Sequence, residues 1–277
     1  MEIRFSNSKI EQNMIPKIIH YCWFSGEEYP PLIQKCIDSW HKYLPDYEFR
    51  KWDATSFDFD SLPIVKAAIE AKKWAFAADY IRVYAIYHYG GIYIDSDVEL
   101  FSSLDHLLDC NAFFGTDTIP KPDTDYCYPE AGIFGGNAGI SYMAKILDYY
   151  EKVPGSLSKE VLDNLAFEDV SKNNIYDSTG KERLCIAPIV LGHFMQEHGY
   201  CPKNTKQILD EGTVIYPTPY IINHCFKPTK ETIAWHHNTG SWCDFAPRGP
   251  LYKLCHKISF LVPFYEWLER TRIKLNI

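Results

Sequence analysis

Two aspartates, Asp95 and Asp97, stand one residue apart at the end of the segment YGGIYIDSDVEL, residues 89–100. Carboxylates this close repel one another unless a cation or water compensates their charge. Two carboxylates combined with phosphate oxygens and waters are a normal coordination shell for Mg²⁺ or Mn²⁺. The pair therefore indicates a site for a divalent ion that holds a diphosphate. A bare D-x-D motif also occurs in solvated turns after edge strands, and taken alone it favours that simpler interpretation.

Two other kinds of site contain closely spaced aspartates, but the neighbouring residues do not match either of them. A calcium-binding loop needs Asp or Asn and then Gly where Glu99 and Leu100 stand, and a closing Glu where His106 stands. A phosphatase of the haloacid dehalogenase type would place its aspartate nucleophile after the first strand and follow it with Thr or Val at the position of Glu99. Both alternatives are therefore set aside.

A second pair of charges lies upstream in FAADYIRVYAIY, residues 76–87. On a helix, Asp79 and Arg82 lie together at i and i+3, away from the apolar stripe that contains Ala77 and Ile81. A surface ion pair of this kind contributes less than about 1 kcal/mol. Alternatively both residues face a pocket, where the guanidinium offers two parallel donors to phosphate or sugar oxygens. The residues alone leave both interpretations open.

The surrounding pattern predicts an open α/β sheet in a single domain. Apolar runs and alternation predict strands over 17–23, 47–53, 92–95 and 112–117, and a helical spacing between prolines predicts a helix over 30–45. Helix formers fill 62–91, where a glycine pair ends the helix, and further helices are expected at 103–109 and 140–153. The order strand, helix, strand at the start is typical of nucleotide-binding sheets. Residues 155–230 are expected to be irregular α/β.

Composition narrows the class of protein. The formal net charge of −8 over 277 residues argues against nucleic-acid binding, which needs a basic face. Nine cysteines without paired spacing predict neither a zinc site nor a disulfide framework, and favour a reduced, cytosolic setting. No apolar leader and no run of 18 apolar residues occur, so a soluble or peripheral protein is expected. The aromatic content of 16% suits stacking on sugars or bases as well as core packing.

Four blocks of sequence together resemble a known family. They are IPKIIHYCWFSG, FAADYIRVYAIYHYGGIYIDSDVEL, AGIFGGNAG and AWHHNTGSW, which run in this order from residue 15 to residue 242. The same order is seen in DXD-motif sugar transferases of glycosyltransferase family 32. That family includes yeast-type initiating α-mannosyltransferases and bacterial capsule or lipopolysaccharide enzymes, and it is distantly similar to the clostridial glucosylating toxins.

This resemblance implies a GT-A fold, a Rossmann-like open sheet with flanking helices. It also implies a nucleotide-sugar donor (a UDP-sugar favoured over a GDP-sugar), Mn²⁺ or Mg²⁺, and retention of anomeric configuration. Carried over to this sequence, Trp23 would stack on the nucleotide base, with Cys22 at the base edge. Asp79 and Arg82 would contact the donor sugar. The remaining donor-site residues would be Tyr93 on the nucleotide side, Asp95 on the ribose and the metal, and Asp97 directly on the metal.

The resemblance also assigns roles to the last block. His237 matches the position of a metal ligand, with His236 as the alternative, and imidazole suits Mn²⁺ as a ligand. Ser241 and Trp242 would close over the diphosphate. For retention, neither Asp79 nor Glu130 presents itself as a carboxylate nucleophile. We therefore expect attack on the face from which the diphosphate leaves, with a departing phosphate oxygen as base.

The resulting expectation is a metal-dependent retaining glycosyltransferase that moves a hexose or N-acetylhexosamine to a glycan or lipid-linked oligosaccharide, in bacterial surface polysaccharide synthesis. A protein-glycosylating effector and a non-catalytic carbohydrate-binding protein are the alternatives. The catalytic domain is expected to span 1–249. Residues 250–277 would form a basic amphipathic helical segment that either completes this domain or rests on the membrane. The expected location is cytoplasmic, with peripheral contact to the inner face of the membrane.

Overall fold

A computed structural model describes residues 14–56, 62–118, 127–152, 175–176, 180 and 182–239. Its centre is a seven-stranded sheet with the order β2-β1-β3-β6-β5-β8-β7. The strands are β1 (Ile18–Cys22), β2 (Glu48–Trp52), β3 (Gly91–Ile94), β5 (Ala112–Asp117), β6 (Tyr128–Gly136), β7 (Gln207–Ile208) and β8 (Thr213–Tyr216). Strands β2, β1 and β3 are parallel, and β6 runs antiparallel to both β3 and β5. The expected α/β sheet with flanking helices is confirmed.

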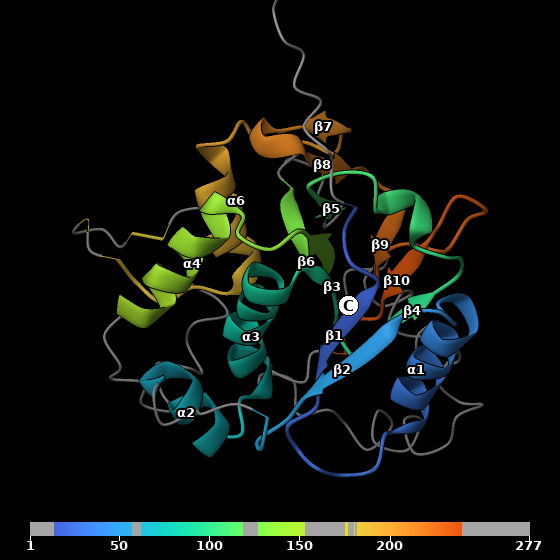
Figure 1. The fold of residues 1–277 in the computed structure, drawn as a ribbon, viewed down its shortest axis with the longest axis horizontal. Helices are drawn as coiled ribbons and strands as arrows, with labels where there is room; N and C mark the ends of the chain where they lie inside the picture. The colour runs from blue at the N-terminus through green and yellow to red at the C-terminus, as the bar shows by residue number, and fades with distance from the viewer. Residues whose placement is uncertain are drawn as a thin grey trace, which may run out of the picture.

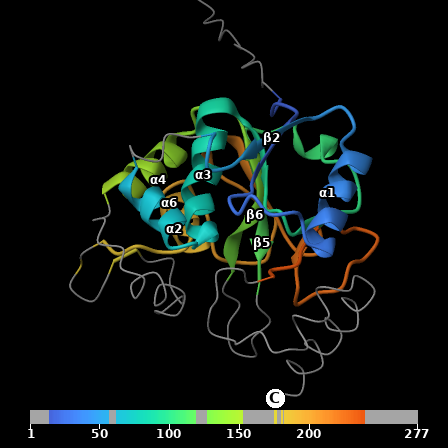
Figure 2. The same ribbon diagram turned by 90° about the horizontal axis from the view of Figure 1, so that it is seen from below.

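The two faces of this sheet are covered by different elements (Figures 1 and 2). One face packs against α2 (Pro63–Glu70), α3 (Trp74–Tyr89), α4 (Ser141–Lys152) and α6 (Ala187–Gln196). The other face packs against α1 (Pro31–Tyr43) and a small sheet of order β4-β10-β9, formed by Val98–Leu100, Ala234–His236 and Ile221–Asn223. Strand alternation separates the two cores: Tyr93 joins the first, and Ile92 and Ile94 join the second.

Most of the predicted elements are confirmed, and one of them is divided. The helix-forming stretch 62–91 forms two helices, because Lys72 adopts a φ of 57° between α2 and α3. Only a short 3₁₀ turn, Asp105–Leu107, forms within 103–109. Strand β6, which no apolar alternation announces, runs through the AGIFGG motif at the centre of the sheet.

The glycine pair does more than end helix α3. Gly91 has a φ of 109°, and a Cβ there would lie 2.6 Å from the carbonyl oxygen of Ile18. The chain can therefore turn from α3 into β3 beside β1 only with glycine at this position. The buried His20 side chain of β1 stabilises the same turn, because its Nε2 lies 2.9 Å from the Gly90 carbonyl oxygen. Strand β3 thus leaves the turn in a fixed register and delivers Asp95 at its end.

Within the described residues, no helix combines the length and apolar character needed to span a bilayer. The segment 250–277 lies outside those residues, as do Ser241 and Trp242.

Candidate functional site

Asp95 and Asp97 flank a tight turn between the central sheet and the small sheet. Asp95 directly follows β3, and its backbone N–H donates to the Gly132 carbonyl oxygen of β6 at 2.7 Å. The N–H of Val98, the first residue of β4, donates back to the Asp95 carbonyl oxygen at 3.0 Å. The two carboxylate side chains retain 23% and 12% of their exposure, so both are largely buried. A solvated surface turn, the simpler interpretation of the motif, does not describe this burial.

Both oxygens of Asp95 are held by neighbouring side chains. The Tyr93 hydroxyl donates to Oδ1 at 2.8 Å, and Arg82 Nη1 donates to Oδ2 at 3.2 Å. The guanidinium also lies over the Tyr93 ring, 4.8 Å from its centroid. Burial raises the pKa of Asp95, and the charge of Arg82 opposes that rise. Tyr93 is fully buried, so the structure places it beneath Asp95 as a support.

Arg82 and Asp79 form a buried ion pair on α3, not a surface pair. Arg82 Nη2 lies 3.0 Å from Asp79 Oδ1, with side-chain exposures of 5% and 11%. Arg82 also donates to the carbonyl oxygens of Ala78 and Ala131. The other Asp79 oxygen accepts the N–H of Ala187, at the start of α6, where a carboxylate is favoured by the helix dipole. Burial raises the pKa of Asp79 to about 6, against the opposing effects of Arg82 and this backbone bond.

Asp97 is oriented by the segment that follows β10. Its Oδ2 accepts hydrogen bonds from the backbone N–H of Thr239 at 2.8 Å and from the Thr239 hydroxyl at 2.9 Å. Its Oδ1 lies 3.4 Å from His236 Nε2. Burial alone would raise the pKa of Asp97, but the nearby His236 and the Thr239 donors outweigh it and hold the pKa well below its usual range. Asp97 is therefore a preoriented, ionised carboxylate.

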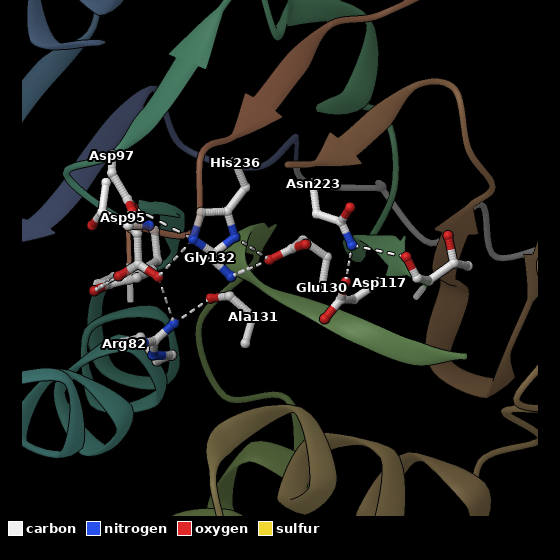
Figure 3. Close-up of polar contacts among 12 residues, drawn as sticks. Arg82, Asp95, Asp97, Asp117, Glu130, Ala131, Gly132, Asn223 and His236 are labelled. Atoms are coloured by element: carbon white, nitrogen blue, oxygen red, sulfur yellow. Dashed lines mark hydrogen bonds and ion pairs between the residues drawn. The ribbon is translucent and has the colours of Figure 1, made fainter. Parts of the chain in front are cut away.

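His236 links the aspartate pair to a third carboxylate (Figure 3). Its Nε2 faces Asp97 and lies 3.9 Å from Asp95 Oδ2, while its Nδ1 lies 2.9 Å from Glu130 Oε1 on β6. Burial would lower the pKa of His236, but the charges of Glu130 and Asp97 outweigh burial and raise it well above its usual value. The imidazole thus acts as a partner of several carboxylates.

Beyond Glu130, the acidic side chains continue to the end of β5 (Figure 3). Asn223 Nδ2 donates to Asp117 Oδ1 at 2.6 Å and to the carbonyl oxygen of Thr118 at 2.9 Å. Burial and the charge of Glu130 raise the pKa of Asp117 to about 6, although the Asn223 amide opposes this rise. The site therefore extends from β3 across β6 to β5.

His237, the residue first assigned as the metal ligand, lies elsewhere. Its Nε2 is 3.1 Å from Glu99 Oε2, and Glu99 in turn binds Lys35 of α1 at 2.8 Å. Neighbouring residues of a strand point to opposite faces, and β10 pairs with β4 so that His236 opposes Val98. Of the two histidines that the sequence left open, the structure brings His236 to the aspartate pair.

The residues expected to hold the nucleotide base lie at the end of β1. The Cys22 thiol is buried near Tyr93 and Arg82, and this burial raises its pKa to about 12. Trp23 is partly buried; its Nε1–H donates to the Glu27 carbonyl oxygen at 2.8 Å, and its ring packs edge-on against Tyr29. Cys22 thus lies near Arg82 and Tyr93, while the Trp23 side chain contacts the loop that follows β1.

Several contributors to the site had no role assigned from the sequence, among them Glu130 and Thr239. Glu130 binds the imidazole of His236, and Thr239 holds Asp97. Glu130 and Gly132 are two residues apart, which places them on one face of a strand. This spacing was the only indication in the sequence that the two residues act together. Thr239 lies within the AWHHNTGSW motif, but its partner is 142 residues away and depends on the tertiary fold.

The charges of the site are not balanced by the described residues in contact with it. Four carboxylates (Asp79, Asp95, Asp97 and Glu130) contact Arg82 or His236. With His236 neutral, four negative charges and one positive charge leave −3; with His236 protonated, they leave −2. Such an excess in a largely buried site favours binding of a further cation, since the alternative is protonation of a carboxylate such as Asp79 or Asp95.

The donor set fits a divalent cation by its chemistry. Among the described residues, no group of three or more His, Cys, Asp or Glu side chains forms a ready metal site. However, His236 Nε2 lies 3.4 Å from Asp97 Oδ1 and 3.9 Å from Asp95 Oδ2. Adjacent ligands of an octahedral ion at about 2.1 Å lie about 3 Å apart, so small adjustments would suffice. Carboxylate and imidazole are ligands that Mn²⁺ accepts.

Comparison with known proteins identifies the family. The chain belongs to the capsular polysaccharide synthesis protein family, whose sequence profile matches residues 1–152, more than half of its 277 residues. The inositol phosphoceramide mannosyltransferase 2 of Schizosaccharomyces pombe is 39% identical over 102 residues, which are 34% of this chain and 28% of that protein. The mannosyl phosphorylinositol ceramide synthase SUR1 of Saccharomyces cerevisiae is 36% identical over 107 residues, 36% and 27% of the two chains. The resemblance to family 32 sugar transferases is confirmed at the level of family.

Among solved structures, the galactosyltransferase LgtC with donor and acceptor sugar analogues matches 90% of this chain and 94% of its own, with 13% identity and a TM-score of 0.36. A glycosyltransferase involved in glycosylation of the major capsid of PBCV-1 matches 81% and 94%, with 14% identity and a TM-score of 0.35. A likeness at this level carries no functional information. The matched region spans under a third of the fungal relatives, so their activities are not transferred to this chain by similarity alone.

Proposed function

We propose that this protein is a metal-dependent, retaining glycosyltransferase that moves a hexose from a nucleotide-sugar to a glycan or lipid-linked acceptor. The observation that carries the proposal is the paired arrangement at the end of β3. Asp95 is clamped by Arg82 and Tyr93, and Asp97 is oriented by Thr239 toward His236. Together with the net negative charge of the described residues at the site, this arrangement suits a cation that holds a diphosphate.

Asp95, Asp97 and His236 would hold Mn²⁺ or Mg²⁺. When bound, the ion supplies electrostatic stabilisation of the charge that develops on the departing diphosphate. His236 takes the ligand role first assigned to His237, because its imidazole is the one beside both aspartates.

The protein's own residues would prepare this site in advance. Arg82 has hydrogen bonds to Asp95 and two backbone carbonyls and an ion pair with Asp79, so its main task is to fix Asp95. The two Thr239 donors occupy one oxygen of Asp97 and leave the other directed at His236. Fixed ligands of this kind need little reorganisation when substrate binds, which is the condition for effective electrostatic catalysis.

For the chemical step we propose attack on the face from which the diphosphate departs. The acceptor oxygen bonds to the anomeric carbon as the bond from that carbon to the phosphate oxygen breaks. The acceptor's proton passes to the departing phosphate. Glu130, one of the two carboxylates considered as a nucleophile, has its Oε1 engaged by Gly132 N–H and His236, which disfavours a covalent intermediate.

The comparisons guide the choice of substrates to test. The two fungal relatives are named for mannosyl transfer to an inositol phosphoceramide, and the family description refers to capsular polysaccharide. A GDP-linked mannose donor therefore joins the UDP-sugars that the sequence favoured, and a lipid-linked acceptor joins free glycans. We further propose action at the cytoplasmic face of a membrane in surface polysaccharide synthesis, with residues 250–277 as the lipid contact.

The test is a donor panel. Purified protein is incubated with Mn²⁺ and UDP- or GDP-sugars, and nucleotide release and sugar transfer are measured with and without a chelator. The proposal expects chelator-sensitive release with at least one donor, and retention of configuration in the product. Release no greater than that of an Asp97→Asn variant with every donor would reject the proposal. Calorimetry with free glycans would then test the carbohydrate-binding alternative, because a lectin needs neither nucleotide nor Mn²⁺.

A further inference from the structure

The contact between Glu130 and His236 joins two parts of the chain that are 106 residues apart. Glu130 lies on β6 of the central sheet, and His236 is the last residue of β10 in the small sheet. Glu130 is almost fully buried at 3% exposure, and its Oε1 accepts the Gly132 N–H at 2.7 Å as well as facing His236 Nδ1 at 2.9 Å. The carboxylate is therefore held in place before it meets the imidazole.

This contact determines which nitrogen of His236 faces the aspartates (Figure 3). A carboxylate next to Nδ1 keeps a proton on that nitrogen, because a carboxylate can only accept a hydrogen bond. The ring binds a cation in its neutral form, after the proton on Nε2 has left, and its lone pair is then on Nε2, the atom that lies 3.4 Å from Asp97 Oδ1. Histidines that bind metals commonly donate their second N–H to a carboxylate in this way, which fixes both the tautomer and the ring orientation.

Gly132, two positions after Glu130, allows the His236 ring to come this close to Glu130. A Cβ at Gly132 would lie 2.5 Å from both Cε1 and Nδ1 of His236, and 3.0 Å from Glu130 Oε1. Any side chain at position 132 would therefore displace the imidazole from Glu130. Glu130 and Gly132 together thus fix the position of the His236 ring.

We propose that Glu130 is a positioning residue that holds His236 with Nε2 directed at Asp95 and Asp97, ready to bind a divalent ion. The inference rests on the proposed function for the ion itself, but it assigns a new role to a residue that does not touch the ion. Glu130 acts here through its hydrogen bond to Nδ1 and not through its charge alone.

The experiment measures Mn²⁺ binding to the full chain without nucleotide, by titration against the electron paramagnetic resonance of free Mn²⁺. Glu130→Ala should weaken Mn²⁺ binding by roughly 10- to 100-fold, as loss of a carboxylate behind a metal-ligating histidine does elsewhere. Glu130→Gln removes the charge but keeps an oxygen that accepts the Nδ1 proton, so its affinity should stay within about threefold of the unaltered protein. Gly132→Ala should weaken binding as Glu130→Ala does.

Gly115→Ala is the matched control for disturbance of the fold. A Cβ at Gly115 would lie 2.7 Å from Cβ of Ile221, so this variant also forces a buried clash, but against an apolar side chain. It should lower the unfolding temperature and leave Mn²⁺ affinity unchanged.

The possible outcomes are distinct. Equal Mn²⁺ affinity in Glu130→Ala and the unaltered protein would overturn the inference and leave the metal site standing. Equal weakening in Glu130→Gln and Glu130→Ala would also overturn it, in favour of a purely electrostatic role. Absence of Mn²⁺ binding by the unaltered protein would reject the metal in the proposed function, and the inference with it. If Glu130→Ala does not fold, the Gln and Gly132→Ala variants still decide between these outcomes.

Discussion

His236 ends strand β10 and His237 directly follows it, and each contacts a buried glutamate, yet they serve different parts of the molecule. His236 lies between Glu130 and the aspartate pair, at the border of the two sheets. His237 lies between Glu99 and Trp235, whose ring centroid is 4.3 Å away, on the side covered by α1. The two residues have the same chemistry and nearly the same backbone position.

The difference between the two clusters is their charge balance. Glu99 has both His237 and Lys35 as partners, so among the described residues its charge is already balanced by that of Lys35. On the His236 side, the carboxylates outnumber Arg82 and His236 together. A balanced buried cluster holds elements together, whereas an unbalanced one favours binding of a further cation or uptake of protons. This comparison supports the proposed binding site on the His236 side, whereas the His237 side connects α1, β4 and β10.

The largest effect is expected from neutralising one aspartate on the unbalanced side. Asp97→Asn should lower transfer activity by about 1000-fold, roughly 4 kcal/mol, because the ion loses its best-oriented carboxylate. The fold should remain, since Thr239 can still bond the amide oxygen. The matched variant Glu99→Gln, on the balanced side, should reduce stability and leave kcat within a few-fold. Activity and unfolding temperature are measured for both, and equal activity losses would contradict the assignment of the two sides.

The sequence predicted the framework of this site better than its details. Alternation in β3 placed Tyr93 and Asp95 on one face, and the structure confirms this because the glycine turn fixes the strand's start. Alternation also requires His236 and His237 to point apart, but it cannot say which one faces the aspartates. That choice depends on the pairing of β10 with β4, two strands separated by more than 130 residues. The Asp79–Arg82 pair was predicted as a pair, and only the packing of α6 over it reveals that it is buried.

A third histidine, His20, sharpens the comparison because it is held in its neutral form. It accepts the Trp52 indole N–H at Nδ1 and donates from Nε2 to the Gly90 carbonyl oxygen. Burial lowers its pKa from 6.5 to about 4, and the Gly90 bond opposes this only in part. Since the folded pKa is the lower one, the stabilisation is complete above pH 6.5 and is lost as the pH falls toward 4.

The measurable consequence is that the unaltered protein and a His20→Gln variant should differ less in their free energy of unfolding as the pH falls. The advantage of the unaltered protein over His20→Gln should shrink by about 3 kcal/mol between pH 7.5 and pH 4, since one pKa unit corresponds to about 1.4 kcal/mol. Denaturant unfolding at a series of pH values measures it. Because both proteins share all other titrating groups, a constant difference would show that His20 is not neutral by burial.

Replacing His236 and His237 one at a time by Gln tests the comparison directly. His236→Gln should weaken Mn²⁺ affinity and activity by roughly 10- to 100-fold, and should also lower the free energy of unfolding, because Glu130 loses a buried partner. His237→Gln should leave Mn²⁺ affinity unaltered, with about 1 to 2 kcal/mol lost from the free energy of unfolding, because Glu99 loses a buried partner. Affinity and unfolding are measured on the same preparations. A metal-binding defect in His237→Gln alone would restore that residue as the ligand.

The smallest effect on stability is expected from replacing Lys35, the exposed partner of Glu99 on the His237 side. Its side chain is 59% exposed while that of Glu99 is 11% exposed, so solvent screens the ion pair between them. Lys35→Met keeps the aliphatic stem and should cost less than about 1 kcal/mol in the free energy of unfolding, with a smaller loss in 1 M salt. Mn²⁺ affinity should be unaltered, because Lys35 belongs to the cluster that lacks the aspartates. A loss as large as that of His237→Gln would mean that Glu99 depends on the lysine charge, and that charge balance, not the histidine contact, maintains this connection of α1, β4 and β10.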